Sequence, residues 1–153
     1  MYPTKERIME RLPPIKEEVL TYMKFWKELW IINKKHSNEY KLNTLTEMLH
    51  NLADIYKKPI NVQYSPESST AYYECITKTI HITKSLSIIS ALHEFAHHIF
   101  GKSELQACRW SVSVYSKTFP KSFEKLKWEG HMLVKNKDQK YEYTQPNNSL
   151  HDS

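Results

Sequence analysis

Glycine is scarce in this sequence, with only two residues in 153. So low a content favours a helical protein with few tight backbone approaches. Cysteine is equally scarce. Cys75 and Cys108 lie far apart without a paired spacing, so we expect two reduced thiols in a cytoplasmic protein. No apolar run approaches the length of a bilayer, and the first residues contain no apolar signal-peptide core, so we expect neither membrane insertion nor conventional secretion.

Arginine is the third shortage, because it provides only three of the 22 basic residues behind the net charge of +5. A basic protein can bind nucleic acid through phosphates. Readout of base edges, however, favours the bidentate fork of arginine, and the lysines form no dense run. Nucleic acid is therefore allowed as a partner but not favoured, and a solvated lysine surface is the better interpretation.

The composition, with 40% hydrophobic and 25% charged residues, is that of a globular protein. The length predicts one domain with a core of its own. We expect this domain to cover residues 1–135, with an N-terminal helical part (1–43), a central core (44–117) and a C-terminal helix and strand (118–135). Residues 136–153 are polar and are expected to be a disordered tail.

Apolar residues at helical spacing predict two helices in the first part of the chain. The first covers residues 15–34. The second begins at Thr44, which has the spacing of a capping box with Glu47, and ends before Pro59. The two apolar stripes consist of Ile15, Val19, Met23, Trp26 and Trp30 in the first helix, and Leu45, Met48, Leu49, Leu52 and Tyr56 in the second.

Alternating apolar and polar residues then predict three strands, at 60–64, 71–76 and 79–83. The last two are expected to pair antiparallel across a short turn at 77–78. A sheet this small leaves a strand at its edge, and such an edge can accept an extended peptide as an added strand.

Strand 71–76 is the expected edge, because the strand after it leads into the central helix described next. We expect Tyr72, Tyr73 and Glu74 to bind a peptide through their backbone. The alternation of a strand would place the outward N–H groups on Tyr72, Glu74 and Ile76.

The central stretch, residues 87–101, contains His93, Glu94 and His97 in a helical pattern that ends at Gly101. Positions i and i+4 of a helix lie one above the other, so both imidazoles can bind one ion. Glu94 is rotated about 100° from His93, which leaves its carboxylate beside the ion and free to take a proton from a water. This is the H-E-x-x-H arrangement of zinc peptidases.

A catalytic zinc usually has three protein ligands and a water, so one ligand is still needed. Glu104 is the expected third ligand, because the turn at 101–103 lets the next helix fold back and brings it towards His97. That helix begins with Ser103 and Gln106 in the spacing of a second capping box. Cys108 lies one turn further on and His131 much later in the chain. His131 is the competing ligand. Cys108 could also face the site, but it is expected to be a small buried thiol.

After residue 115, Pro120 is expected to start an amphipathic helix that contains Phe123, Leu126 and Trp128 and ends at Gly130. Residues 131–134 are predicted to form a final strand.

The combination of a small sheet, a Leu-His-Glu-Phe-Ala-His-His helix and a following Glu104-x-x-Ala107 with Trp110-Ser111 resembles the ImmA/IrrE family of minimal gluzincin metallopeptidases. The resemblance covers about residues 45–115. It implies an α+β, zincin-like fold with a small, mainly antiparallel sheet packed on the H-E-x-x-H helix and on a helix that carries the glutamate ligand. It also implies Zn²⁺ as the cofactor and Glu104 as its third ligand.

The expected activity is hydrolysis of a peptide bond in a protein substrate, such as a regulatory or host protein in a bacterial or phage setting. Glu94 would pass a proton from water to the leaving amine. Oxyanion stabilisation is open between four side chains, and His81 and His98 are expected to be structural. The four candidates for the oxyanion are His131, Tyr115, Tyr72 and Tyr73.

The competing hypothesis is a non-catalytic protein of the same fold that binds protein or DNA, such as a phage antirepressor. An intact Glu94 argues against it, because a binding scaffold does not require this carboxylate.

Overall fold

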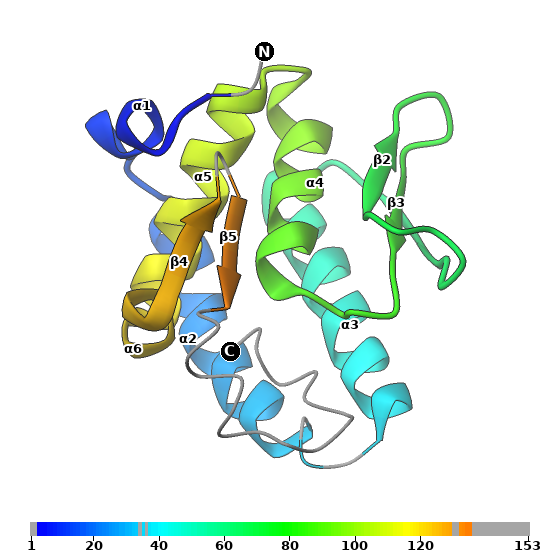
Figure 1. The fold of residues 1–153 in the computed structure, drawn as a ribbon. Coiled ribbons are helices and arrows are strands. Elements are labelled where there is room, and N and C mark those ends of the chain that lie inside the picture. Colours follow the sequence, from blue (N-terminus) through cyan, green and yellow to red (C-terminus); the bar gives the residue numbers. More distant parts are fainter. Residues whose placement is uncertain (1–2, 34, 36, 130–131, 136–153) are drawn as a thin grey trace.

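The computed structural model describes residues 3–33, 35, 37–129 and 132–135. It is an α+β structure in which a three-stranded sheet lies at one edge of the helices, next to α3 and α4 (Figure 1). In chain order the elements are α1 (Lys5–Glu10), α2 (Glu17–Asn33), α3 (Asn38–Tyr56), β1 (Asn61–Tyr64), β2 (Tyr72–Glu74), β3 (Thr79–Ile82), α4 (Ile88–Phe100), α5 (Glu104–Thr118), α6 (Pro120–Lys125), β4 (Leu126–Glu129) and β5 (Met132–Lys135).

The two predicted N-terminal helices are present, but the second starts earlier than expected. Ser37, not Thr44, is the N-cap of α3, and its hydroxyl accepts a hydrogen bond from the Tyr40 N–H at 3.4 Å. Thr44 lies inside the helix and donates to the Tyr40 carbonyl at 2.8 Å. The early turns lack a continuous apolar stripe; Leu42 packs on the core there, and Lys41 is 2% exposed with its Nζ 5.6 Å from the Trp30 ring centroid.

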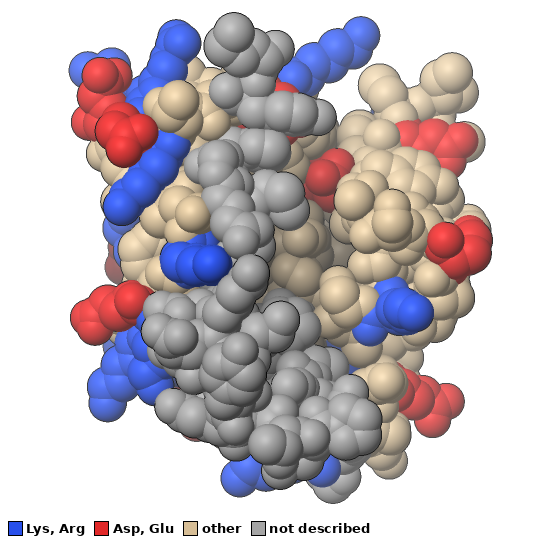
Figure 2. Space-filling model, viewed as in Figure 1, with Lys and Arg blue, Asp and Glu red and all other residues tan. Residues whose placement is uncertain are grey.

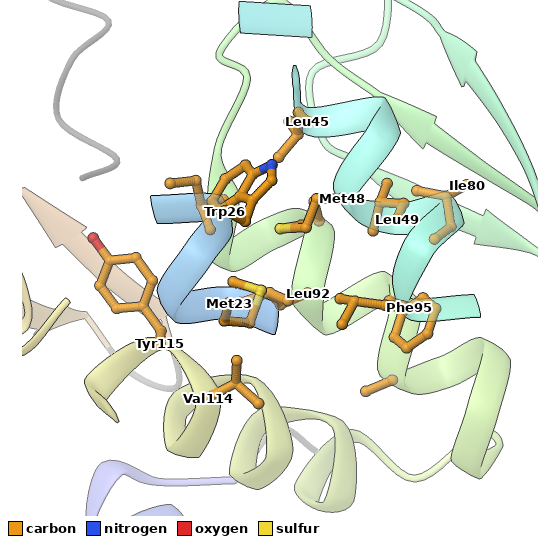
Figure 3. Packing of buried hydrophobic residues seen from close by; sticks show 14 of the residues in the cluster. Met23, Trp26, Leu45, Met48, Leu49, Ile80, Leu92, Phe95, Val114 and Tyr115 are labelled. Atoms are coloured by element: carbon orange, nitrogen blue, oxygen red, sulfur yellow. The ribbon is translucent and has the colours of Figure 1, made fainter. Parts of the chain in front are cut away.

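The core lies where α2, α3, α4 and α5 meet, and it includes most of the predicted stripes. Met23, Leu92 and Val114, from α2, α4 and α5, lie close together in this cluster (Figure 3). The indoles of Trp26 and Trp30 stack with centroids 5.3 Å apart. Ile15 and Tyr56 are only partly buried at its margin. The predicted stripe residues that have no exposed surface are Val19, Met23, Trp26, Trp30, Leu45, Met48, Leu49 and Leu52.

The sheet has the strand order β1-β3-β2, so β2 is an edge, as expected. The prediction of a mainly antiparallel sheet is wrong. β1 pairs parallel with β3, whereas β2 pairs antiparallel with it. The central strand β3 is buried at all four positions. β2 and β3 both contact α4, which places the sheet on one side of this helix and α5 on the other (Figure 1).

The segment after α5 also differs from the prediction. The helix that starts at Pro120 ends at Lys125, and Leu126 and Trp128 belong to strand β4, which pairs antiparallel with β5. The reason is the alternation of Leu126 and Trp128 with charged residues, which suits a strand of period two better than a helix. The predicted tail, residues 136–153, and Gly130 and His131 lie outside the described residues.

The charged residues do not form a basic track on the face shown in Figure 2, as far as the described residues go. Lys and Arg side chains alternate there with Asp and Glu around the rim. Among the helices of the described residues, none combines the length and the apolar character that a bilayer crossing requires.

Candidate metal centre

Two capped helices and a short turn hold the candidate metal ligands together. Ser87 caps α4 by accepting from the Ser90 N–H at 3.1 Å, and Ser103 caps α5 by accepting from the Gln106 N–H at 3.1 Å. Between the helices, Gly101 has φ of 103°, a conformation that side chains with a Cβ rarely adopt. The chain therefore reverses within a few residues, and α5 packs along α4 (Figure 1).

His93, His97 and Glu104 converge at this turn, as predicted. Their ligand atoms all lie within 4.8 Å of one another. Nε2 of His93 is 3.2 Å from Glu104 Oε2, and Nε2 of His97 is 2.8 Å from Glu104 Oε1. The two imidazole rings stand nearly perpendicular, with centroids 4.9 Å apart. Two imidazole nitrogens and a carboxylate facing one point form a donor set suited to zinc.

The outer nitrogens of both histidines are also occupied. Nδ1 of His97 donates to the Gly101 carbonyl at 2.8 Å, and Nδ1 of His93 lies 3.8 Å from the Cys108 sulfur. A carbonyl only accepts hydrogen bonds, so neutral His97 carries its proton on Nδ1 and directs a lone pair from Nε2 towards Glu104. Contacts of this kind orient metal-binding histidines in proteins. The protein therefore fixes the rings in the orientation that an ion needs.

Cys108 was predicted to be a buried thiol, and it is 3% exposed. Burial, and to a lesser extent the carboxylates of Glu104 and Glu94, raise the pKa of this thiol to about 12. Its position one turn after Glu104 on the same helix allows it to face the site as well, and its sulfur lies 3.8 Å from Nδ1 of His93. Both cysteines are free thiols, as expected.

Glu94 lies beside the three ligands without belonging to their cluster. Burial raises the pKa of its carboxyl from 4.5 to about 7. The charge of His97 and a hydrogen bond from the backbone N–H of Tyr73 lower this pKa, whereas the charge of Glu104 raises it. A carboxylate with a pKa near neutrality is suited to take up and release a proton at physiological pH.

Comparisons with protein-family models, curated proteins and solved structures give no match. The assignment of a function therefore depends on the site itself.

Strand β2 is attached to α4 next to this site. The Tyr73 hydroxyl donates to Nδ1 of His98 at 2.8 Å, and Nε2 of His98 donates to the Lys58 carbonyl at 2.9 Å. We refer to Tyr73, His98 and Lys58 as the β2 clamp. Since the Tyr73 N–H is bonded to Glu94, it points away from β3. The clamp therefore places the outer edge of β2 against the helix that carries the candidate ligands.

The direction of the Tyr73 N–H differs from the prediction of which N–H groups of the edge strand point outward. Neighbouring residues of an antiparallel strand point their N–H groups in opposite directions. Tyr73 faces outward, so Tyr72 and Glu74, which lie opposite His81 and Thr79, face β3. The predicted outward set of Tyr72, Glu74 and Ile76 is wrong by one residue, and Ile76 lies in the turn after the strand.

Of the described tyrosines among the predicted oxyanion donors, Tyr73 and Tyr115 are engaged elsewhere, whereas Tyr72 is 42% exposed. The Tyr73 hydroxyl is bonded to His98, and the Tyr72 ring stacks on His81 with centroids 4.2 Å apart. Tyr115 is 1% exposed and lies in the core against Phe119. The fourth candidate, His131, which was also the competing ligand, lies outside the described residues.

His81 forms a polar bridge across the sheet that sequence reasoning did not predict. Its Nδ1 lies 2.9 Å from the Ser65 hydroxyl, and its Nε2 lies 2.9 Å from a Glu74 carboxylate oxygen. The hydrogen bond with His81 lowers the pKa of Glu74. The order Ser-His-Glu is that of a hydrolase triad, but Ser65 is only 1% exposed and cannot reach a substrate. The expected structural role of His81 therefore holds, and Glu74 binds His81 through its side chain.

Proposed function

We propose that this protein is a zinc-dependent metallopeptidase. One observation carries the proposal: His93, His97 and Glu104 converge around one point, and Glu94 is adjacent but not part of the ligand cluster. A metal site with a purely structural role would more often be closed by a fourth protein ligand. Three ligands and a nearby base instead suit hydrolysis.

The donor set fits zinc in its chemistry. His93, His97 and Glu104 would hold the ion, with the outer nitrogens of both histidines already held by Cys108 and Gly101. When bound, Zn²⁺ acts as a Lewis acid that polarises a carbonyl oxygen and acidifies water. The other contributions to catalysis come from the side chains around the ion site.

Glu94 provides the proton transfer in this proposal. Its partly buried carboxylate accepts a proton from the attacking water and delivers it to the nitrogen of the departing amine. Its hydrogen bond from the Tyr73 N–H holds it in place between α4 and β2. This bond already uses the outward N–H of β2, so the expected main-chain pairing of a peptide along this edge would require its release.

The proposal is tested by comparing zinc-loaded wild type with Glu94→Gln in a bacterial lysate, using chemical labelling of new peptide N-termini. Wild type should generate a defined set of new termini, and Glu94→Gln should reduce their formation about 100-fold or more. The matched control is Glu67→Gln, a change in an exposed loop that should retain activity. Equal cleavage by wild type and Glu94→Gln would exclude this base. Binding of a host protein with no cleavage by either would support the non-catalytic alternative.

A further inference from the structure

A second concave site lies away from the metal ligands, where four parts of the chain meet. It is a pocket of about 790 Å³ between the α1–α2 connection, the end of α3, the end of α4 and the first turns of α5. This volume falls in the range that binds small molecules, about 300–1,000 Å³. Ser103 and Leu105 line it, but the ligand Glu104 between them does not. The pocket is therefore a separate site that borders the same helix.

Hydrogen bonds from α5 hold α1 and the α1–α2 connection, which forms one wall of the pocket. The guanidinium of Arg109 donates to the Arg7 carbonyl at 2.6 Å, and the Ser113 hydroxyl donates to the Pro13 carbonyl at 2.9 Å. Pro13 and Pro14 follow one another in this wall, and each ring restricts its backbone φ. The pocket is therefore formed before any ligand arrives, which lowers the entropic cost of binding.

Three aromatic rings provide the apolar part of the pocket. Tyr56, Phe100 and Trp110 come from three different helices and all line it. The Tyr56 and Phe100 centroids are 6.1 Å apart, and those of Phe100 and Trp110 are 5.9 Å apart. Tyr56 and Phe100 are partly buried and offer stacking and edge contacts to a flat ligand, whereas Trp110 is 3% exposed and adds little open surface.

Three cationic side chains, Arg11, Lys16 and Arg109, line the same pocket, and the residues that line it include no acidic side chain. Nζ of Lys16 lies 4.5 Å from the Tyr56 centroid, which places a positive charge directly beside the aromatic part. The nearest carboxylate contact of Arg109 is Glu10, outside the pocket, at 3.5 Å. Arg109 uses Nε and Nη2 for its contacts within the described part of the chain, so Nη1 can still donate.

We propose that this pocket binds a small planar organic anion. Its rings would pack against Tyr56 and Phe100, and its carboxylate or phosphate would be held by Arg11, Lys16 and Arg109. The aromatic surface selects a flat body, and the excess of positive charge without a lining acid selects an anion. Neither the aromatic nor the cationic part of this pocket takes part in metal binding or in proton transfer by Glu94.

Isothermal titration calorimetry of the full chain, dialysed against a chelator, tests the proposal independently of zinc and of proteolysis. The probes are naphthalene-2-carboxylate, the neutral 2-naphthamide, and acetate. The anionic naphthalene should bind at least about tenfold more tightly than either other probe, because only it uses both parts of the pocket. Its affinity should fall as salt is raised, since the partly exposed charges are screened.

The double variant Arg11→Gln/Lys16→Gln should weaken binding of naphthalene-2-carboxylate by about tenfold or more. Its matched control is Lys24→Gln/Lys84→Gln, which removes two exposed charges outside the pocket and should leave the affinity unchanged. Phe100→Leu keeps an apolar wall but removes a ring, so it should weaken both naphthalene probes and leave acetate unaffected. Equal affinity for the charged and neutral naphthalenes, no binding of either, or an unchanged affinity in the double variant would overturn the proposal.

Discussion

The backbone N–H of Tyr73 donates a hydrogen bond to the carboxylate of Glu94, so the edge strand β2 and the helix α4 meet at the candidate base. The same residue uses its hydroxyl to bond His98, the neighbour of the candidate ligand His97. One residue of the sheet thus contacts two side chains of α4, Glu94 and His98. The geometry of the edge and the geometry of the metal site are therefore linked through Tyr73.

The first prediction concerns the metal. Purified protein should contain about one zinc per chain, and Glu104→Ala should lose most of it, because two imidazoles alone bind the ion weakly. Elemental analysis of the dialysed proteins measures this, with the exposed Glu67→Ala as the control that should retain zinc. Retention of zinc in Glu104→Ala together with its loss in His131→Ala would show that His131 is the third ligand.

The second prediction concerns the stability of the metal-free protein as a function of pH. The pKa of Glu94 is raised from 4.5 to about 7 on folding, so the unfolded chain releases this proton at lower pH than the folded protein does. The free energy of unfolding should therefore fall as the pH rises from about 4.5 to about 7, and this contribution should stay constant above that range.

Glu94→Gln removes this titration. The variant should match wild type near pH 4.5 and be more stable by about 2 kcal/mol at pH 8, after allowance for partial exposure of the group. Urea unfolding at several pH values gives the comparison. A wild-type protein that gains stability over Glu94→Gln between pH 5 and 8 would contradict the burial of this carboxyl.

The third prediction concerns the β2 clamp. Tyr73→Phe removes the hydrogen bond to His98 and should lower the free energy of unfolding by about 1 kcal/mol. Hydrogen exchange of the amides in β2 should become faster, because the strand loses a contact to α4. Tyr64→Phe is the matched control, since Tyr64 is 42% exposed on the opposite edge strand β1. Equal effects of the two changes would show that the clamp does not hold the strand.

The fourth prediction concerns the thiols. In the native protein an alkylating reagent should modify Cys75, which is exposed, while Cys108 should react only after unfolding. Mass spectrometry of proteolytic fragments after timed labelling measures both sites. Rapid native labelling of Cys108 would indicate that α5 opens readily beside the candidate metal site.

The candidate metal site could be predicted because its signals are local. His93 and His97 are related by one helical turn, and Ser103 and Gly101 specify where one helix ends and the next begins. The start of α3 could not be predicted in the same way, because Ser37 and Thr44 both have the composition of an N-cap. The decision depends on burial of Lys41 against Trp30, which is a contact between two helices.

The pairing direction and the edge of the sheet could not be predicted, for a similar reason. Nothing in either strand specifies the parallel direction in which Asn61 pairs with Thr79, and the helices next to these strands, α3 and α4, contact each other only in the folded protein. The outward face of β2 depends on which residue begins the pairing, and an error of one position exchanges Tyr73 for Tyr72. The strand that contains Trp128 could not be predicted either, since an apolar residue after a short helix fits either a further helical turn or a strand.

The closeness of the ligands along the chain has a consequence for folding. Glu104 follows His93 by only eleven positions. Closing so short a loop costs little entropy, and two adjacent helices can form contacts early. The pairing of β1 with β3, by contrast, joins segments that are separated by the whole β2 hairpin. If the proposed zinc binds, its three ligands would therefore come together in the α4–α5 hairpin before the sheet has assembled, and the ion would act on the folding pathway as an early template for the protein.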